Sequence, residues 1–251
     1  MGNYLNPDNS KFQEALNSDI YVDKTGLIRY TNSVLHTLQK NICVSRPRRF
    51  GKSMAANMLT AYYSKGCDSK ELFSNLKIAK DTDFEKYLNK YDTIFLNMQD
   101  FLSRSNNIQE LMERVRKIVL RELRSAYPDV DFFDENDLIE SMQDVYAYSR
   151  CPFVIIIDEW DVLIRDEASN QKIQDDYINF LRGMFKGTEP TKYIQLAYLT
   201  GILPIKKEKT QSALNNFDEF TMVSPSILAQ YIGFTEAEVQ KLSDKYHQDF
   251  D

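Results

Sequence analysis

Glycine, cysteine and histidine are all scarce in this chain of 251 residues. The 8 glycines are about 3% of the chain, where average usage is about 7%, which argues against flexible linkers and against sites that need several glycines in a row. The 3 cysteines (Cys43, Cys67 and Cys151) lie far apart without a CxxC pair, so we expect neither a disulfide framework nor a zinc site. The 2 histidines, His36 and His247, leave almost no material for histidine catalysis or metal binding.

Long hydrophobic runs and an excess of positive charge are also missing. The longest strongly apolar run, Phe153–Ile157, is far shorter than the ~20 residues that span a bilayer. The N-terminus has neither the basic nor the apolar segment of a secretory signal. Lys and Arg sum to 31 and Asp and Glu to 37, a net charge of −6, which argues against a dedicated nucleic-acid-binding protein. We therefore expect a cytoplasmic protein without a membrane partner, and direct nucleic-acid binding by this chain has no support.

The hydrophobic pattern predicts alternating strands and helices. Long amphipathic stretches separate four short apolar runs and a weaker fifth one, at 41–45, 93–98, 153–157, 193–199 and 220–223. Residues 108–123 and 173–185 repeat apolar side chains at steps of three and four, which indicates helices. Such alternation predicts an α/β fold, a three-layer α/β/α sandwich with a mainly parallel sheet.

Three regions follow from this pattern. Residues 1–40 form an N-terminal arm and a helix, and residues 41–224 form the α/β core. Residues 225–251 are the start of a C-terminal helical region. Because the sequence stops on a charged tail, we expect that last region to be truncated here.

The most informative segment is Ser45–Ser53, SRPRRFGKS, which follows an apolar strand and opens a predicted helix. A P-loop has this position, and its backbone N–H groups cradle phosphates at a helix N-terminus. Lys52 would reach the β- and γ-phosphates, and Ser53 would bind Mg²⁺ through its hydroxyl. The segment departs from the pattern GxxxxGK[ST] only at Arg46, where the first glycine is expected.

The alternative interpretation of this segment is a basic turn on a solvated surface. With the second motif below taken into account, we favour the P-loop. The predicted phosphate-binding residues are Arg46, Pro47, Arg48, Arg49, Phe50, Gly51, Lys52 and Ser53.

The second motif is the apolar run 153–157 followed by Asp158 and Glu159. A buried central strand that ends in two acids is typical of a Walker B motif. Asp158 would hold Mg²⁺ beside the nucleotide, and Glu159 would activate the attacking water. The alternative is a core strand followed by a helix with an acidic first turn, which the helix dipole favours. A P-loop about 100 residues upstream makes the Walker B interpretation the better one.

A further strand ends in Thr200 and Gly201. In AAA-like sheets, the strand beside Walker B ends in a polar residue that senses the γ-phosphate, and Thr200 fits this role. An ordinary Thr-Gly turn that closes a strand explains the same residues equally well.

Taken together, these segments resemble the predicted AAA-ATPase-like family of bacterial P-loop proteins. The resemblance spans nearly the whole chain, and the segments that carry it, in family order, are Tyr21–Thr25, RPRRFGKS at 46–53, Ile157–Asp161, Leu199–Leu203, Leu214–Phe217 and Gly233–Glu236. That family accepts arginine at the first Walker A position, so Arg46 fits it. Trp160 stands where the family usually has tyrosine, another flat aromatic residue.

The resemblance implies an ATPase core of the AAA/STAND type with ATP and Mg²⁺ as ligands. Many family members continue into a PD-(D/E)xK nuclease-like domain, and nothing after Gly233 supplies one here. A C-terminal nuclease-like domain or another effector, missing from this chain, is therefore the expected partner. By analogy of fold alone, both a ring-like oligomer and a monomer stay open.

Two assignments have alternatives that the sequence leaves open. Arg46, Arg48 or Arg49 would contact the charge that develops on phosphate, or else would pair with Glu159 or Asp161 and hold the empty loop closed. The segment Tyr21–Thr25 would lie near the adenine, or else Asp23 and Lys24 would form a structural ion pair, which we slightly favour.

Three functions compete. The first is a Mg²⁺-dependent ATPase in which Lys52, Glu159 and Thr200 are catalytic, Ser53 and Asp158 hold the metal, and hydrolysis drives a conformational switch in an effector. The second is a nucleotide sensor or interaction module that does not hydrolyse ATP and that controls a nuclease-like effector. The third, a kinase with a P-loop, is disfavoured because the adjacent acids at 158–159 suit water activation and no Arg-rich lid follows the sheet.

Overall fold

The structure is a computed structural model that describes residues 2–166, 171–205 and 214–247. Its strands are β1 (Asn41–Ser45), β2 (Asp92–Asn97), β3 (Phe153–Asp158), β4 (Ile194–Gly201) and β5 (Asp218–Phe220). Within the described residues they form one sheet in the order β2-β3-β4-β1-β5, and every neighbouring pair is parallel. The α/β class and the parallel sheet are thereby confirmed.

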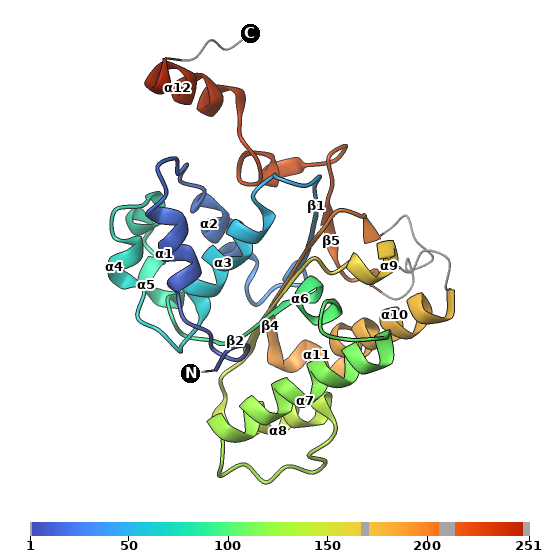
Figure 1. Cartoon of the computed structure of the whole chain (residues 1–251). Coiled ribbons are helices and arrows are strands. Elements are labelled where there is room, and N and C mark those ends of the chain that lie inside the picture. Colours follow the sequence, from blue (N-terminus) through green and yellow to red (C-terminus); the bar gives the residue numbers. More distant parts are fainter. Residues whose placement is uncertain (1, 167–170, 206–213, 248–251) are drawn as a thin grey trace.

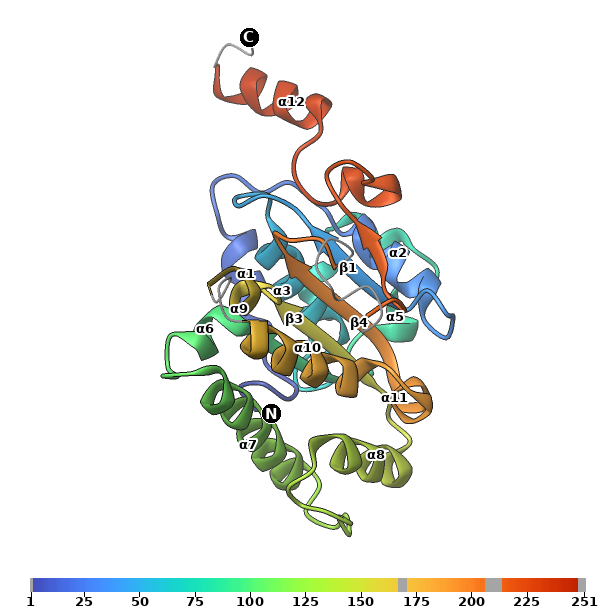
Figure 2. The ribbon, with the colours of Figure 1, turned by 90° about the vertical axis from the view of Figure 1, so that its right-hand side faces the viewer.

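Helices cover both faces of this sheet (Figures 1 and 2). On one face lie α1 (Ser10–Leu16), α2 (Gly26–Val34), α3 (Lys52–Tyr63), α4 (Lys70–Phe73), η1 (Lys77–Lys80) and α5 (Phe84–Tyr87). On the other lie α6 (Met98–Leu102), α7 (Ile108–Ala126), α8 (Leu138–Ser149), α9 (Val162–Asp166), α10 (Gln171–Phe185) and α11 (Thr188–Tyr193). The predicted three-layer sandwich is therefore present.

Strand side chains alternate between two hydrophobic cores, as the pleat of a strand requires. In β3, Val154 and Ile156 pack with α1–α5, whereas Phe153, Ile155 and Ile157 pack with α6–α11. All five of these side chains are completely buried. A strand buried on both faces reads as a continuous apolar run, which is why this strand was recognisable in the sequence.

The N-terminal arm covers the outer edge of β2. Leu5 forms an antiparallel bridge with Ile94, and the N–H of Phe95 donates to the carbonyl of Tyr4 at 2.9 Å. The carboxylate of Glu122 in α7 accepts the N–H groups of Asn3, Tyr4 and Leu5. The arm thus satisfies backbone groups that an open sheet edge would leave unpaired.

The C-terminal region leaves the sheet after β5. It continues through η4 (Ser226–Gln230) to α12 (Glu236–Tyr246), which begins with a capping box between Thr235 and Glu238. None of the α12 side chains is buried, and both ribbon views show this helix extending from the body of the molecule. Helices after residue 225 agree with the predicted helical character, and residues 248–251 of that predicted region lie outside the described residues.

The predicted strands and helices have their observed counterparts within a few residues. The strand predicted at 93–98 is one residue earlier, because Met98 begins α6, where the Asn97 side chain accepts the N–H groups of Gln99 and Asp100. The fifth strand lies at 218–220 and not at 220–223. Among the described helices, none is both long and apolar enough to cross a bilayer.

Candidate functional site

The carboxyl ends of β1, β4 and β3 lie side by side and bring the predicted motifs together. The strand β4 pairs with β1 on one side and with β3 on the other. Thr200, at the end of β4, is therefore placed between the loop that follows β1 and the acids that follow β3. In open parallel sheets, this edge is where ligands bind.

The loop after β1 turns sharply into α3. Arg49 and Gly51 have φ angles of +70° and +78°, in the left-handed region. A Cβ at Gly51 would meet no atom within 4 Å, so its backbone conformation, and not lack of space, favours glycine there. No side chain caps the N-terminus of α3, so its first N–H groups are available to an anion.

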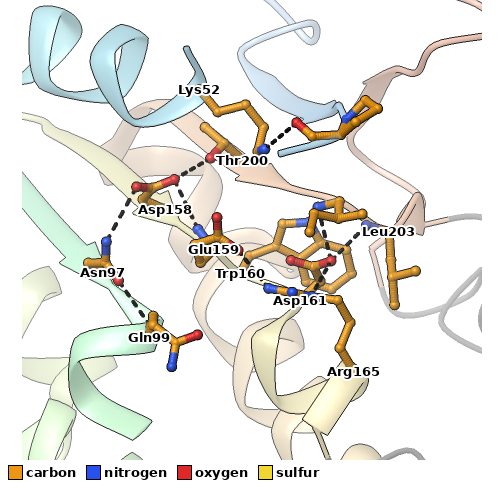
Figure 3. A network of polar contacts seen from close by, with 12 residues as sticks. Lys52, Asn97, Gln99, Asp158, Glu159, Trp160, Asp161, Arg165, Thr200 and Leu203 are labelled. Carbon is orange, nitrogen blue, oxygen red and sulfur yellow. Dashed lines mark hydrogen bonds and ion pairs between the residues drawn. The ribbon is translucent and has the colours of Figure 1, made fainter. Parts of the chain in front are cut away.

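Lys52, in the first turn of α3, is buried, and its Nζ donates to the carbonyl of Pro47 at 2.9 Å (Figure 3). This bond folds the ammonium group back over the loop. Burial lowers the pKa of Lys52, and the negative charges of Glu159 and Asp158 oppose that shift. The loop thus holds a cation close to the acids of β3.

Arg46 points in another direction from the rest of the loop. The residue is 2% exposed, and Nη1 of its guanidinium donates to the carbonyls of Ser45 and Phe220 at 3.0 and 2.9 Å. Its backbone N–H donates to the carbonyl of Gly201 at 3.0 Å. Arg46 therefore joins β1 to β5 and β4, and its side chain is oriented into the sheet instead of toward the loop cavity.

Asp158 is a completely buried carboxylate that links three strands. One oxygen accepts the hydroxyl of Thr200 at 2.5 Å and the N–H of Glu159 at 3.1 Å, and the other accepts the side-chain amide of Asn97 at 3.4 Å (Figure 3). Asp158 and Thr200, each predicted separately as a site residue, are thus in direct contact. Asn97 was not among the predicted site residues, although its place at the end of a strand is the same signal that identified Thr200.

Glu159 follows in the left-handed conformation, with φ of +53°, which costs a residue other than glycine about 1–2 kcal/mol. The next residue fixes this turn, since the N–H of Trp160 donates to the carbonyl of Thr200 at 3.0 Å. The Glu159 carboxylate forms an ion pair with Arg165 of α9, with Oε2 and Nη2 2.6 Å apart. The cation that pairs with Glu159 is thus Arg165, and not Arg46, Arg48 or Arg49 as one alternative had it.

Asp161 completes this side of the site. Its Oδ2 accepts the N–H groups of Ile202 and Leu203 at 3.0 and 2.6 Å and lies 3.1 Å from Nε of Arg165. A Cβ at Gly201 would come within 2.6 Å of Asp161, so glycine is required there for this close packing. Asp161 and Arg165 have the i,i+4 spacing of a helical ion pair, but no pattern in the sequence indicated that Arg165 also binds Glu159.

A cavity of about 450 Å³ opens beside Lys52, Asn97 and Glu159, whereas the buried Asp158 and Thr200 are not among its lining residues. Its lining residues come from the loop after β1, from α3, from the end of β2 with α6, and from the end of β3: Arg48, Arg49, Gly51, Lys52, Ser53, Met54, Asn97, Gln99, Asp100 and Glu159. The predicted residues Lys52, Ser53 and Glu159 therefore face one space, together with the exposed Arg48 and Arg49. Arg46 is not among its lining residues.

A smaller, more apolar cavity of about 170 Å³ adjoins the first. It is lined by residues of the segment 20–24, of the loop Arg49–Gly51, of α3 and of the segment Tyr231–Phe234. Arg49, Gly51 and Met54 line both cavities. The contribution of 231–234 was not predictable from the loop motif, since it comes from about 180 residues further along the chain.

The segment Tyr21–Thr25 lines the apolar cavity and also makes structural contacts, although not the ion pair considered for it. Tyr21 and Lys24 line the apolar cavity, and burial raises the pKa of Tyr21. Asp23 accepts the N–H and hydroxyl of Thr25 at 2.9 and 2.6 Å, and Lys24 pairs with Glu238 of α12 at 2.5 Å. The prediction of an ion pair between Asp23 and Lys24 is therefore wrong, because Asp23 binds Thr25 and Lys24 binds Glu238.

Comparison with known proteins adds three findings. A family model described as predicted AAA-ATPase matches residues 10–210. An uncharacterized protein in the vnfD 5′ region of Azotobacter chroococcum mcd 1 is 23% identical over 229 residues, a match that covers 87% of this chain and 40% of that protein. The Aeropyrum pernix ORC2 protein, solved as ADPNP–ADP complexes, aligns with a TM-score of 0.41 and 12% identity over 86% of this chain and 51% of that one. The chain thus spans about two-fifths and about half of these proteins.

The buried contacts of Arg46 predict a structural role. Arg46→Met should lower the free energy of unfolding by about 1–3 kcal/mol, because the carbonyls of Ser45 and Phe220 lose a buried donor. Urea denaturation of the nucleotide-free protein measures this effect. Arg48→Met, at an exposed position of the same loop, is the matched control and should change the value by less than about 0.5 kcal/mol. Equal, small effects of the two changes would contradict the structural role of Arg46.

Proposed function

This chain belongs to the predicted AAA-ATPase-like family, and from that premise we propose that it binds ATP with Mg²⁺ and hydrolyses it to drive a conformational switch. Family membership supports an ATPase-like, nucleotide-binding function. The observation that carries the proposal is that Lys52, Ser53 and Glu159 line one cavity, beside the buried pair of Asp158 and Thr200.

Lys52 and the start of α3 are the proposed phosphate site. Among the described residues, the hydrogen-bond partner of Lys52 Nζ is a neutral carbonyl at 2.9 Å, and a phosphate oxygen would give it a charge-assisted hydrogen bond, which is stronger. The uncapped N–H groups of α3 supply further donors. Arg48 and Arg49, both exposed and lining the cavity, are proposed to contact the phosphates as well.

The donor set at this site fits Mg²⁺. Magnesium prefers oxygen ligands and is commonly held by one or two carboxylates together with phosphate and water. Asp158 offers a buried carboxylate whose three donors are uncharged, and Ser53 offers a hydroxyl on the cavity wall. When bound, the ion would neutralise charge on the β- and γ-phosphates.

Glu159 is the proposed general base. In hydrolysis, the oxygen of water bonds to the γ-phosphorus and the bond from that phosphorus to the bridging oxygen of ADP breaks. Glu159 would orient this water and accept its proton. Thr200, whose hydroxyl donates to Asp158, is proposed to respond when the γ-phosphate arrives or leaves.

The apolar cavity is the proposed site of the base. It offers the rings of Tyr21, Phe50 and Phe234 together with Met54 and Met58, surfaces on which a purine can stack. Because Arg49 and Gly51 line both cavities, a nucleotide with its phosphates at Lys52 would place its base here.

The switch is proposed to pass through the C-terminal region. Phe234 lines the apolar cavity with its ring centroid 6.0 Å from Nζ of Lys24, and four residues later Glu238 pairs with the same lysine. We further propose that residues 41–224 form the NTPase core, preceded by the arm and helix of residues 1–40. Residues 225–251 would then begin a helical region that relays the nucleotide state to an effector, for which a nuclease-like domain is the candidate.

One observation favours a second candidate function, that of a nucleotide sensor without turnover. Glu159 is engaged by Arg165, so the proposed base is occupied in this structure. Measurements of ATP binding and of phosphate release on the same sample distinguish the two functions, since a sensor binds ATP and releases no phosphate.

Lys52→Ala should weaken ATP binding at least ~30-fold, because truncating one partner of a buried charge contact costs about 2 kcal/mol or more. Titration calorimetry with MgATP measures the affinity. Lys90→Ala, an exposed lysine outside both cavities, is the control and should bind ATP as the unchanged protein does. Unaltered affinity in Lys52→Ala would place the phosphates elsewhere.

Glu159→Gln should retain ATP affinity within about three-fold and lose phosphate release by ~10²–10⁴-fold, as expected when a general base is removed. A coupled phosphate assay in parallel with calorimetry measures both quantities. Glu14→Gln, on the exposed face of α1, is the matched control. Normal turnover in Glu159→Gln would remove Glu159 from the role of base.

Phe234→Ala should weaken ATP and ADP binding alike, by about three- to ten-fold, because the base loses a stacking surface that both nucleotides share. Met222→Ala removes an exposed apolar side chain outside the cavity and should leave both affinities unchanged. A loss confined to ATP would assign Phe234 to the phosphates instead of the base.

A further inference from the structure

We propose that Arg165 is a positioning residue that holds the Glu159 carboxylate in a resting orientation and so keeps turnover low. This inference rests on the proposed function, in which Glu159 activates water. The ion pair adds a restraint on Glu159 that neither the motif at 46–53 nor the motif at 153–159 contains.

The ion pair between the two residues is short and largely removed from solvent. Nη2 of Arg165 and Oε2 of Glu159 are 2.6 Å apart, and the side chains are 16% and 22% exposed. At such burial, water screens the attraction less than it does at a surface ion pair. A guanidinium also binds a carboxylate in a fixed direction. The Glu159 carboxylate is therefore held toward α9, although its residue lines the cavity.

Arg165 is itself held in place from the other side. Its Nε lies 3.1 Å from Oδ2 of Asp161, a completely buried carboxylate one helical turn earlier. The same oxygen accepts the N–H groups of Ile202 and Leu203. Asp161 thus joins Arg165 to the segment that directly follows Thr200 and Gly201, as Figure 3 shows.

These contacts form a continuous path from the segment 202–203 through Asp161 and Arg165 to Glu159. A displacement of 202–203, when a partner binds or when Thr200 responds to the γ-phosphate, would move Arg165 and release Glu159. Water activation requires that Glu159 turn an oxygen toward the γ-phosphate, so the ion pair with Arg165 has to be broken or reoriented in each turnover. Its removal should therefore act on kcat.

A contact of Arg165 with phosphate would have the opposite consequence. An arginine that stabilises the charge of the transition state raises turnover by ~10³–10⁵-fold, so its loss would lower kcat. Here Nη2 and Nε already face Glu159 and Asp161. Arg165, although described, does not line the larger cavity, the one that Lys52, Ser53 and Glu159 line. The geometry favours restraint of Glu159.

Arg165→Met is the decisive variant, because methionine keeps an apolar stem and removes the charge. In the full chain with MgATP, kcat should rise about five-fold, the effect expected for loss of about 1 kcal/mol of ion pairing, while the Kd for ATP stays within two-fold. Arg165→Lys keeps the cation and should return kcat toward that of the unchanged protein. Arg29→Met, which removes a surface ion pair with Asp81, is the control for loss of charge alone and should leave kcat unchanged.

A crystal structure of nucleotide-free Arg165→Met tests the restraint without any turnover. The Glu159 carboxylate should leave its position beside α9 and turn into the cavity toward Lys52. Unchanged or lower kcat in Arg165→Met, or a Glu159 that keeps its orientation in that structure, would overturn the proposal. If no variant binds MgATP, the proposed function fails, and the nucleotide-free structure still decides whether Arg165 holds Glu159.

Discussion

At the carboxyl end of β3, the completely buried carboxylate of Asp158 accepts hydrogen bonds from Thr200 of β4, from the N–H of Glu159 and from Asn97 of β2. A buried charge is tolerated only when it is well hydrogen-bonded or paired, and these uncharged donors meet the first requirement. The same bonds fix the ends of three neighbouring strands relative to one another. The position of Glu159 and the turn through Trp160, whose N–H donates to the carbonyl of Thr200, follow from this arrangement. A cation brought by a nucleotide would meet a carboxylate that the fold has already oriented.

Two sets of contacts support the residues on either side of Asp158. On one side, Arg46 ties the loop after β1 to the carbonyls of Ser45 and Phe220, so the residue that replaces the first glycine stabilises the frame of the loop. On the other side, Asp161 and Arg165 connect Glu159 to the segment after β4. The loop that would bind phosphate and the acid that would activate water are therefore supported from opposite directions, and each support can be altered independently of the other.

The sequence was sufficient for the parts of the fold that depend on local pattern. The strand at 153–158 is buried on both faces and reads as one apolar run, and the helix predicted after Gly51 begins at Lys52. Phe234 escaped because it reaches its cavity from a distant segment of the chain. Asn97 ends a strand and Arg165 lies four residues after Asp161, but neither position reveals the contact with Asp158 or with Glu159. The orientation of Arg46 was equally hidden, since a basic residue in a phosphate-binding loop gives no sign that a carbonyl of β5 will receive it. The scarcity of glycine is compatible with this loop, because Gly51 is the one glycine in it. Arg49 adopts a similar positive φ without being glycine.

We propose that one ATP molecule occupies both cavities, with Mg²⁺ between the loop and β3. The decisive measurement is a crystal structure of the full chain with Mg²⁺ and a non-hydrolysable ATP analogue. We expect the triphosphate on Lys52 and the N-terminus of α3, the metal between Ser53 and Asp158, and the base between Tyr21 and Phe234. An analogue bound at another surface, or a metal held without Asp158, would show that ATP does not bind in this way.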